Sequence, residues 1–283
     1  MQTITMNDGN RIPVVGYGVF QMSSKEVREH LPQAIEAGYR HIDTANLYLN
    51  ERAVGEAVAA CGVPREELFI TTKLFPQSYP AKRCAADIDK TLSRLGLDYL
   101  DLLLFHQPYG DYVDGWRAME DAVRAGKVRS IGLSNFSAAK VREVLDVASI
   151  KPAVLQVEIN PYWNQHELKS ALASEGITYE GWYPLGHGDA GLLGEPIFAE
   201  LAEKYGKTPA QIIMRWQVQE GNVVFPKTTS PAHMAENLDL FDFELADDEM
   251  SRINTLPQRA FYQVPEEAPS WVMTEVDVDA AQR

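Results

Sequence analysis

Four side chains suited to proton transfer stand at the ends of apolar runs or just beyond them. Asp43 closes the apolar run in GYRHIDTANLYLNE (38–51), and Tyr48 follows five residues later. Lys73 lies at the end of ITTKL, and His106 directly follows DLLLF. A free phenol has a pKa near ~10 and is a poor acid at neutral pH, but a nearby ammonium lowers that pKa. Together these residues could protonate an oxygen atom while a hydride arrives at its carbon.

Each residue also has an ordinary explanation when it is considered alone. Asp43 could cap a helix, Lys73 could extend to the surface, His106 could be a hydrogen-bonded core histidine, and Tyr48 could be a wall. The four are more informative as a set, because a buried lysine and aspartate are tolerated mainly as a pair. In that set, Asp43 would hold the Lys73 ammonium, and a neutral His106 would orient a carbonyl oxygen.

These residues can act together only in a fold that brings the ends of several strands close to one another. The apolar pattern predicts strands at 40–44, 68–74, 100–106, 128–134, 153–160, 177–182 and 222–227, after a hairpin around Asn7–Asn10. It predicts helices at 26–38 (with Pro32 in an early turn), 50–62, 84–96, 113–126, 138–148, 165–176, 197–206, 208–221 and 231–241. Helices between continuous apolar strands indicate a parallel sheet covered on both faces. We therefore predict an α/β fold, a (β/α)8 TIM barrel over residues 1–283 as a single domain. The N-terminal hairpin would close the bottom, and a tail from about 257 would either cap the mouth or lie in solvent.

The carboxyl ends of the strands of such a barrel meet at one face. We therefore expect the proton-transfer residues to share that face with the polar residues at the other strand ends. These are Ser134, Asn135, Gln156, Glu158, Trp182, Lys227 and Thr228.

Composition and charge exclude several classes of function. The net charge of −14, from 26 basic and 40 acidic residues, disfavours nucleic acid as a partner. An anionic cofactor would need a local basic group. No apolar run reaches 18 residues, and the first residues do not resemble a secretory signal, so no membrane association is expected. Two unpatterned cysteines, Cys61 and Cys84, favour a cytoplasmic location and no bound metal.

Seven segments together resemble the aldo-keto reductase superfamily. They are GYRHIDTANLYLNE, TTKL (71–74), LLLFHQP (102–108), IGLSNF (131–136), LQVEINPY (155–162), WYPLG (182–186) and FPKTTSPAHMAENL (225–238). The sequence is most similar to the bacterial branch that contains the 2,5-diketo-D-gluconate reductases. The resemblance implies a monomer that uses NADPH to reduce aldehydes or ketones, such as small carbonyls, dicarbonyls or keto sugars. It places Asp43, Tyr48, Lys73 and His106 in the catalytic positions, with Tyr48 as the proton donor.

The resemblance also implies a set of cofactor contacts. Ser134, Asn135 and Gln156 would bind the nicotinamide amide, and Trp182 would stack on the nicotinamide ring. Further along the cofactor, Leu185 would cover the pyrophosphate, Lys227 and Thr228 would bind the 2′-phosphate, and Glu236 and Asn237 would contact the adenine. Lys227 would also supply the local positive charge that an acidic protein needs.

Four positions depart from the family pattern. Gln107 replaces a common tryptophan, and Phe20 and Phe75 stand where tryptophan is frequent, so a wider or more polar substrate pocket is expected. His233 replaces an arginine beside the adenine and the 2′-phosphate. A neutral histidine provides less charge than a guanidinium, so we expect weaker discrimination against NADH.

Parts of the sequence are also compatible with two other functions and one other fold. Lys73 could form a Schiff base in a lyase, although Asp43 would keep it charged. The same barrel could bind NADP(H) as an accessory or sensor protein with slow or no turnover. GHGDAG (186–191) matches a dinucleotide-binding pattern, but the residues after it predict helices where that fold needs a strand ending in an acid.

Overall fold

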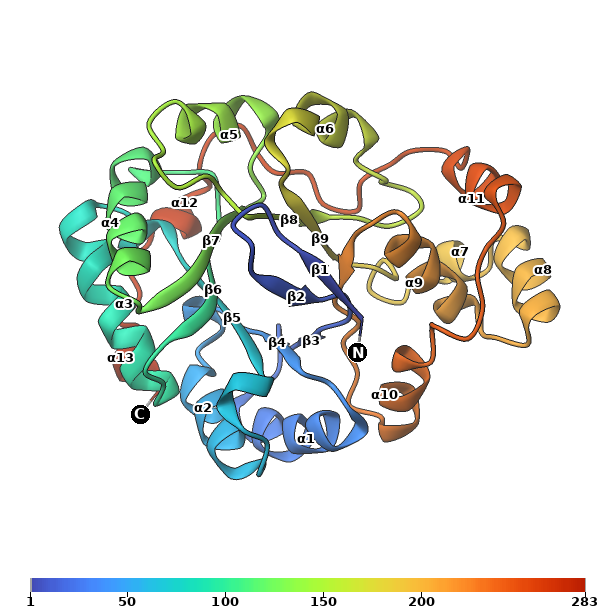
Figure 1. The fold of residues 1–283 in the computed structure, drawn as a ribbon, viewed down its shortest axis with the longest axis horizontal. Coiled ribbons are helices and arrows are strands. Elements are labelled where there is room, and N and C mark those ends of the chain that lie inside the picture. The colour runs from blue at the N-terminus through green and yellow to red at the C-terminus, as the bar shows by residue number, and fades with distance from the viewer. Residues whose placement is uncertain (1, 283) are drawn as a thin grey trace.

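Eight parallel strands form a closed ring in the computed structural model, which describes residues 2–282 (Figure 1). They lie side by side in chain order as β3 (Tyr17–Gly18), β4 (His41–Asp43), β5 (Phe69–Leu74), β6 (Leu100–Phe105), β7 (Val128–Ser134), β8 (Val154–Glu158), β9 (Thr178–Trp182) and β10 (Val223–Val224). A parallel bridge between Val15 and Val224 closes the ring, where the Gly16 amide donates to the Val224 carbonyl at 2.9 Å. The predicted (β/α)8 barrel is confirmed.

Helices surround the ring and connect its strands. They are α1 (Ser24–Ala37), α2 (Glu51–Ala60), α3 (Ala81–Leu95), α4 (Tyr112–Arg124), α5 (Ala138–Leu145), α6 (His166–Ala171), α8 (Pro196–Tyr205), α9 (Pro209–Gln219) and α10 (Pro231–Leu238). In α3, for example, Cys84, Ile88, Leu92 and Leu95 recur every three or four residues and are buried. This spacing places them on one face, which packs against the barrel.

Helix α1 corrects one detail of the sequence analysis. It begins at Ser24, earlier than predicted, because Ser23 and Glu26 form a capping box in which each side chain binds the other's backbone amide. Pro32 therefore lies inside the helix and not in an early turn. Pro32 has no N–H to donate to the backbone carbonyl of Arg28. Arg28 itself is exposed to solvent.

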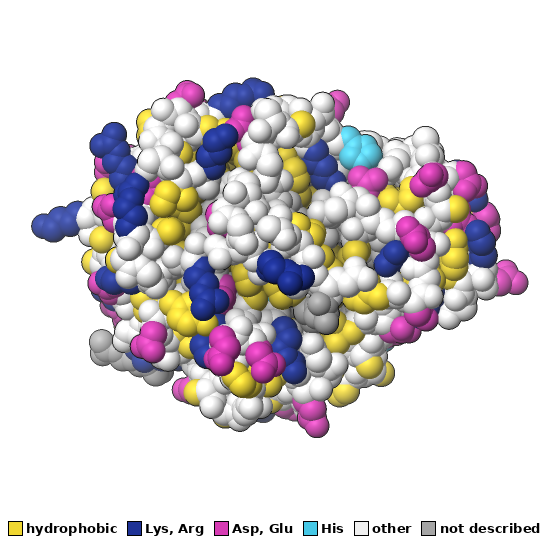
Figure 2. Space-filling view, in the orientation of Figure 1, with side chains coloured by type: hydrophobic (Ala, Val, Ile, Leu, Met, Phe, Trp, Pro, Cys, Tyr) yellow, Lys and Arg dark blue, Asp and Glu magenta, His cyan; other side chains and the backbone are white. Residues whose placement is uncertain are grey.

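The N-terminal hairpin covers one end of the barrel. Strands β1 (Thr3–Thr5) and β2 (Arg11–Pro13) pair antiparallel and lie across the centre of the ring in Figure 1. Met6 and Ile12 pack on Phe69, Leu102 and other apolar side chains of the barrel interior. Acidic and basic side chains are interspersed over this face (Figure 2). The predicted closure of the bottom is confirmed.

The chain after α10 runs across the opposite end of the barrel. It contains α11 (Asp247–Asn254), α12 (Ser270–Met273) and α13 (Val278–Ala281), and in Figure 1 it passes behind the barrel towards α3. The Glu158 carboxylate accepts hydrogen bonds from the backbone amides of Phe261 and Tyr262 at 2.7 and 2.8 Å. Near the other end, Arg94 Nη1 lies 2.7 Å from Asp279 Oδ1. The tail therefore caps the mouth of the barrel and does not lie free in solvent.

No helix within residues 2–282 has the length and apolar character needed to cross a bilayer.

Candidate active site

A cavity of about 960 Å³ opens at the carboxyl ends of the strands. This size is within the range of small-molecule sites. The predicted site residues that line it are Phe20, Asp43, Tyr48, Phe75, His106, Gln107, Ser134, Asn135, Gln156, Trp182, Leu185, Lys227 and Thr228. Lys73 lies directly behind this wall, and its side chain is 1% exposed. His233, Glu236 and Asn237 lie on α10, outside the cavity lining.

Lys73 is the centre of a buried polar cluster. Its Nζ donates hydrogen bonds to Asp43 Oδ1 at 2.6 Å, to the Thr44 carbonyl at 2.9 Å and to the Tyr48 hydroxyl at 3.4 Å. Strand β5 carries Lys73, while the end of the neighbouring strand β4 supplies Asp43. The structure thus brings together the acid, the ammonium and the phenol that the sequence predicted.

A short 3-10 helix, Asn46–Tyr48, places the phenol above the lysine. Asn50 fixes the loop around it, since its side chain accepts from Thr44 Oγ1 at 2.7 Å and donates to the Val19 carbonyl at 3.1 Å. Asn50 is 1% exposed, so these bonds are shielded from water. The loop that carries Tyr48 is therefore held by buried side chains.

The pKa of Tyr48 differs from the sequence prediction. Burial raises it, the charge and hydrogen bond of Lys73 lower it, and Asp43 raises it, which leaves the pKa of Tyr48 at about 12. The expected influence of the ammonium is present, but desolvation outweighs it. At neutral pH the phenol thus keeps its proton, which is the state that a proton donor needs. Burial lowers the pKa of Lys73 less than Asp43 and Tyr48 raise it, so Lys73 stays charged.

His106 is held as a neutral imidazole. Burial and the Lys73 charge lower its pKa well below the usual value. Its Nδ1 is buried and has no hydrogen-bond partner among residues 2–282. An N–H at Nδ1 would therefore lack an acceptor, which favours the tautomer with the proton on Nε2.

A second buried acid, which the sequence analysis missed, lies beneath the cluster. Gln156 Nε2 donates to Asp43 Oδ2 at 3.0 Å and to Glu180 Oε2 at 2.8 Å. Glu180 Oε1 lies 3.9 Å from His41 Nε2, whose own hydrogen-bond partner is Thr71 Oγ1 at 2.9 Å. Burial, and secondarily the Asp43 charge, raise the pKa of Glu180 to about 8, and burial lowers that of His41 to about 3. Both are neutral near pH 7. The signal in the sequence was a carboxylate inside the apolar strand ITYEGW.

Glu180→Gln is expected to change how stability depends on pH. The charged and titratable groups that face Glu180 are His41, Asp43 and Lys73. Since the pKa of Glu180 is raised in the folded protein, its contribution to stability is complete below pH ~4.5 and is lost as pH rises towards 8. The glutamine variant avoids this loss and should be more stable than the wild type at pH 8 by on the order of 4 kcal/mol. At pH 4.5 the two proteins should differ little.

Urea unfolding of both proteins at pH 4.5, 6 and 8 measures this effect. Other carboxylates titrate alike in the two proteins, so the difference between their unfolding free energies isolates Glu180. A difference that stays constant across this range would show that folding does not raise the pKa of Glu180.

The residues predicted to bind nicotinamide are tied to one another. Asn135 Oδ1 accepts from Trp182 Nε1 at 3.0 Å, and Asn135 Nδ2 donates to the His106 carbonyl at 3.0 Å and to Ser134 Oγ at 3.2 Å. Asn135 has a φ of +67°, a left-handed conformation that non-glycine residues rarely adopt. Gln21, Tyr183 and His187 also line the cavity with positive φ. Such conformations concentrate at functional sites, where the surrounding structure holds them.

At the far end of the cavity, Lys227 and Thr228 follow β10. This strand ends at Val224, earlier than predicted, and Phe225–Thr228 leave the sheet and line the cavity. Hydrogen bonds from Ser23 lower the pKa of Glu26, and the nearby charge of Lys227 lowers it further. Glu26 was not predicted as a residue of the cavity. In the sequence it is fully explained as part of the helix cap.

The α10 residues predicted to contact adenine already have partners in the protein. Glu236 Oε1 accepts from Thr208 Oγ1 at 2.5 Å, and Asn237 is buried beside Tyr39. His233 is exposed in the first turn, where its amide donates to the Ser230 cap. The cofactor roles of these three residues remain predictions.

The GHGDAG segment lies near the same end of the cavity. It forms a loop that leads into the short helix α7 (Ala190–Leu193), and His187 and Gly188 line the cavity. The preceding strand β9 belongs to the closed barrel. The match to a dinucleotide-binding fold is therefore coincidental.

Aromatic rings enclose the substrate end of the cavity. The Phe20 and Tyr48 rings lie 5.1 Å apart, and those of Phe75 and His106 lie 5.7 Å apart. The tail adds Trp271, stacked on Phe75 at 6.0 Å, and Tyr262, edge-on to Trp182 at 5.9 Å. No pattern in the sequence had predicted where these two tail aromatics lie.

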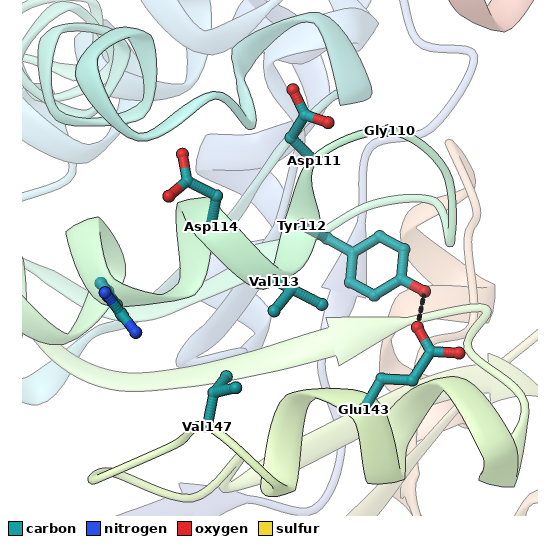
Figure 3. A pocket seen from close by; sticks show the side chains of 8 residues that line it. Gly110, Asp111, Tyr112, Val113, Asp114, Glu143 and Val147 are labelled. Carbon is teal, nitrogen blue, oxygen red and sulfur yellow. Dashed lines mark hydrogen bonds between the residues drawn. The ribbon is translucent and has the colours of Figure 1, made fainter.

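A second cavity, of about 460 Å³, lies between α4 and α5 (Figure 3). Its lining includes Asp111, Asp114 and Arg117, and the Tyr112 hydroxyl donates to Glu143 Oε2 at 2.5 Å. It contains none of the predicted site residues and lacks a buried charged pair like that of Lys73 and Asp43. We therefore assign the candidate active site to the barrel mouth. Within residues 2–282, no group of three or more His, Cys, Asp or Glu side chains could hold a metal ion.

A closed (β/α)8 barrel with buried ionisable groups at the carboxyl ends of its strands is the architecture of a large class of enzymes. Residues 14–257 match the aldo/keto reductase family, so the chain belongs to this family and is an oxidoreductase. An aldo-keto reductase of Mycolicibacterium smegmatis is 43% identical over 89% of this chain and 92% of its own. The methylglyoxal reductase DkgA of Salmonella typhimurium is 42% identical over 90% of this chain and 93% of its own.

Solved structures agree with this assignment. The structure of an aldo-keto reductase of Bombyx mori in complex with NADP has a TM-score of 0.87 and 36% identity, and covers 94% of this chain and 95% of its own. The family that the sequence predicted is confirmed.

Proposed function

We propose that this protein reduces the carbonyl group of small aldehydes or ketones to an alcohol, with NADPH as the hydride source and Tyr48 as the proton donor. The observation that carries the proposal is the hydrogen bond of 3.4 Å from the Lys73 ammonium to the Tyr48 hydroxyl, at the wall of a cavity of about 960 Å³. The similarity to a methylglyoxal reductase and to an NADP complex supports the reaction class and the cofactor.

The residues around the cavity fit a nicotinamide dinucleotide. Both amide hydrogens of Gln156 are used by Asp43 and Glu180, which leaves its Oε1 to accept from a carboxamide. The Trp182 indole is fixed by its bond to Asn135 and offers a flat surface for a ring. Lys227 supplies positive charge where a 2′-phosphate would lie. When bound, NADPH supplies a hydride to the carbonyl carbon.

The side chains around the substrate carbonyl supply and orient the proton. His106 donates from Nε2 to the carbonyl oxygen and orients it, and Tyr48 transfers its phenolic proton to the same oxygen. Lys73 favours this transfer, because its ammonium stabilises the phenolate that remains. Asp43 keeps the ammonium charged and in place through the contact of 2.6 Å.

A carbonyl-dependent NADPH oxidation assay tests the proposal. The substrates should include aldehydes, α-keto esters, dicarbonyls and keto sugars, with NADPH and NADH compared for each. We expect oxidation of NADPH that depends on the carbonyl compound and yields the alcohol. Tight NADPH binding without turnover of any substrate would instead support the accessory or sensor function.

Lys73 is poorly placed for the alternative Schiff-base chemistry. A Schiff-base lysine needs a neutral amine, but the contact with Asp43 and the raised pKa keep Lys73 protonated. Borohydride treatment in the presence of each carbonyl compound should leave Lys73 unmodified. Covalent trapping of substrate on Lys73 would support the lyase.

Cofactor preference is expected to respond to His233. With His233 in place of an arginine, the wild type should prefer NADPH over NADH by less than ~10³-fold in kcat/KM, or about 4 kcal/mol. His233→Arg should raise this preference about 10- to 150-fold, since a charged hydrogen bond to phosphate contributes about 1.5–3 kcal/mol. Steady-state kinetics with both cofactors measure the change. A wild-type preference above ~10³-fold would contradict the expectation.

A further inference from the structure

Gln107 differs from the other predicted walls of the substrate end of the cavity, which are aromatic. It directly follows His106, where the family commonly has tryptophan, and it lines the cavity with 8% of its surface exposed. Phe20, Phe75 and Trp271 provide rings around the same space. Gln107 therefore places a neutral amide among these rings, directly after the imidazole that faces the reacting oxygen.

The backbone of Gln107 is held rigidly. The Tyr79 hydroxyl donates to the backbone carbonyl of Gln107 at 2.9 Å and accepts from the backbone N–H of Gln107 at 2.9 Å. Tyr79 is fully buried, and its ring packs on Phe105 with centroids 4.2 Å apart. A side chain on such a support has a defined position relative to His106, as a selective contact requires.

The side chain of Gln107, in contrast, is not satisfied by the protein. Its Oε1 is buried and has no hydrogen-bond partner among residues 2–282, so the amide meets the cavity through its Nε2 end. Burying a polar group without a partner costs free energy. The fold would avoid this cost with an apolar side chain, so the amide is better explained by a contact with a ligand.

We infer that Gln107 selects carbonyl substrates that carry a second oxygen on the carbon next to the reacting carbonyl, to which its Nε2 donates a hydrogen bond. This class comprises α-hydroxy ketones, α-dicarbonyls and α-keto esters. The inference rests on the proposed function, because it places the reacting carbonyl between Tyr48 and His106. A substrate without the second oxygen leaves the amide unpaired and is bound less well, as in other sites built to bind a polar group.

A pair of ketones with the same number of heavy atoms tests the inference. Hydroxyacetone and butan-2-one differ only in a hydroxyl in place of a methyl group. The ratio of their kcat/KM values, hydroxyacetone over butan-2-one, should be measured in the wild type and in Gln107→Met, which has a similar length but donates no hydrogen bond. Because the intrinsic reactivities of the ketones are the same for both proteins, the change in the ratio reports the amide alone. We expect the ratio to fall about 5- to 150-fold in the variant.

Phe75→Leu is the matched control, since it alters the same wall without changing its hydrogen bonding. Its ratio should stay within about twofold of the wild type. An unchanged ratio in Gln107→Met, with butan-2-one still reduced, would overturn the inference and leave the proposed function intact. Failure of the wild type to reduce any carbonyl compound would overturn both.

Inhibition of the wild type provides a second measurement that needs no variant. Propane-1,2-diol and butan-2-ol are the products of the two ketones and have equal numbers of heavy atoms. The diol should inhibit at least about fivefold more strongly, because it keeps a hydroxyl on the carbon next to the former carbonyl carbon. If Gln107→Met were inactive with both ketones, equal inhibition by these alcohols would overturn the inference and stronger inhibition by the diol would support it.

Discussion

Tyr48→Phe is expected to lower kcat/KM for carbonyl reduction by about 10²–10⁴-fold. A positioned general acid contributes about 10²–10⁴-fold to a rate, and phenylalanine has no proton to give. The variant keeps the ring, so its contacts with Phe20 at 5.1 Å and His106 at 5.5 Å should persist. NADPH binding, followed by fluorescence titration, should change little.

Tyr179→Phe is the control for this substitution. Tyr179 lies on barrel strand β9, and its hydroxyl is buried without a hydrogen-bond partner in the described part of the chain. It is not among the residues that line the cavity, so its removal should leave reduction unaffected. If Tyr48→Phe kept more than about a tenth of wild-type activity, another group would have to supply the proton.

Lys73→Met should lower activity at least about 10²-fold and also destabilise the fold. Without the ammonium, only burial and the Asp43 charge act on Tyr48, and both raise its pKa. Removing one partner of a buried ion pair costs about 3–5 kcal/mol, because the other charge is left unpaired. For a domain of this size, each kcal/mol lowers Tm by about 2–4 °C. Thermal unfolding and steady-state kinetics measure the two effects.

A double variant separates catalysis from stability. Asp43→Asn combined with Lys73→Met removes the unpaired carboxylate, while the asparagine carbonyl can still accept from Gln156. We expect much of the lost stability to return without any recovery of activity. Recovery of both would mean that Lys73 acts only through folding and does not assist proton transfer.

The sequence was sufficient to predict the barrel and the central cluster of the site, for one shared reason. Strand periodicity fixes where each strand ends, and a parallel barrel brings all these ends to one face. Asp43, Lys73 and His106 each stand at such an end, so the topology alone made them neighbours. The same reasoning placed Ser134, Gln156 and Trp182 at the cavity.

Features that depend on three-dimensional surroundings could not be predicted in this way. The pKa of Tyr48 is decided by how completely the phenol is buried, which spacing in the sequence does not report. The carboxylate of Glu180 interrupts an apolar strand, but the sequence does not show which groups surround it, and its partner Gln156 becomes apparent only in three dimensions. Tyr262 and Trp271 follow no regular pattern, so their position over the mouth becomes apparent only when the path of the tail is known.

The path of the tail has a consequence for how the substrate range can diverge. Within the tail, the segment between Pro265 and Val276 is fastened at both ends, by the Tyr109 hydroxyl and by the Gln77 side chain, and it carries the Trp271 wall between them. The entropy lost in closing such a loop grows only slowly with its length. Insertions or deletions of a few residues here would reshape the entrance at little thermodynamic expense, while the barrel and its proton-transfer residues stay as they are.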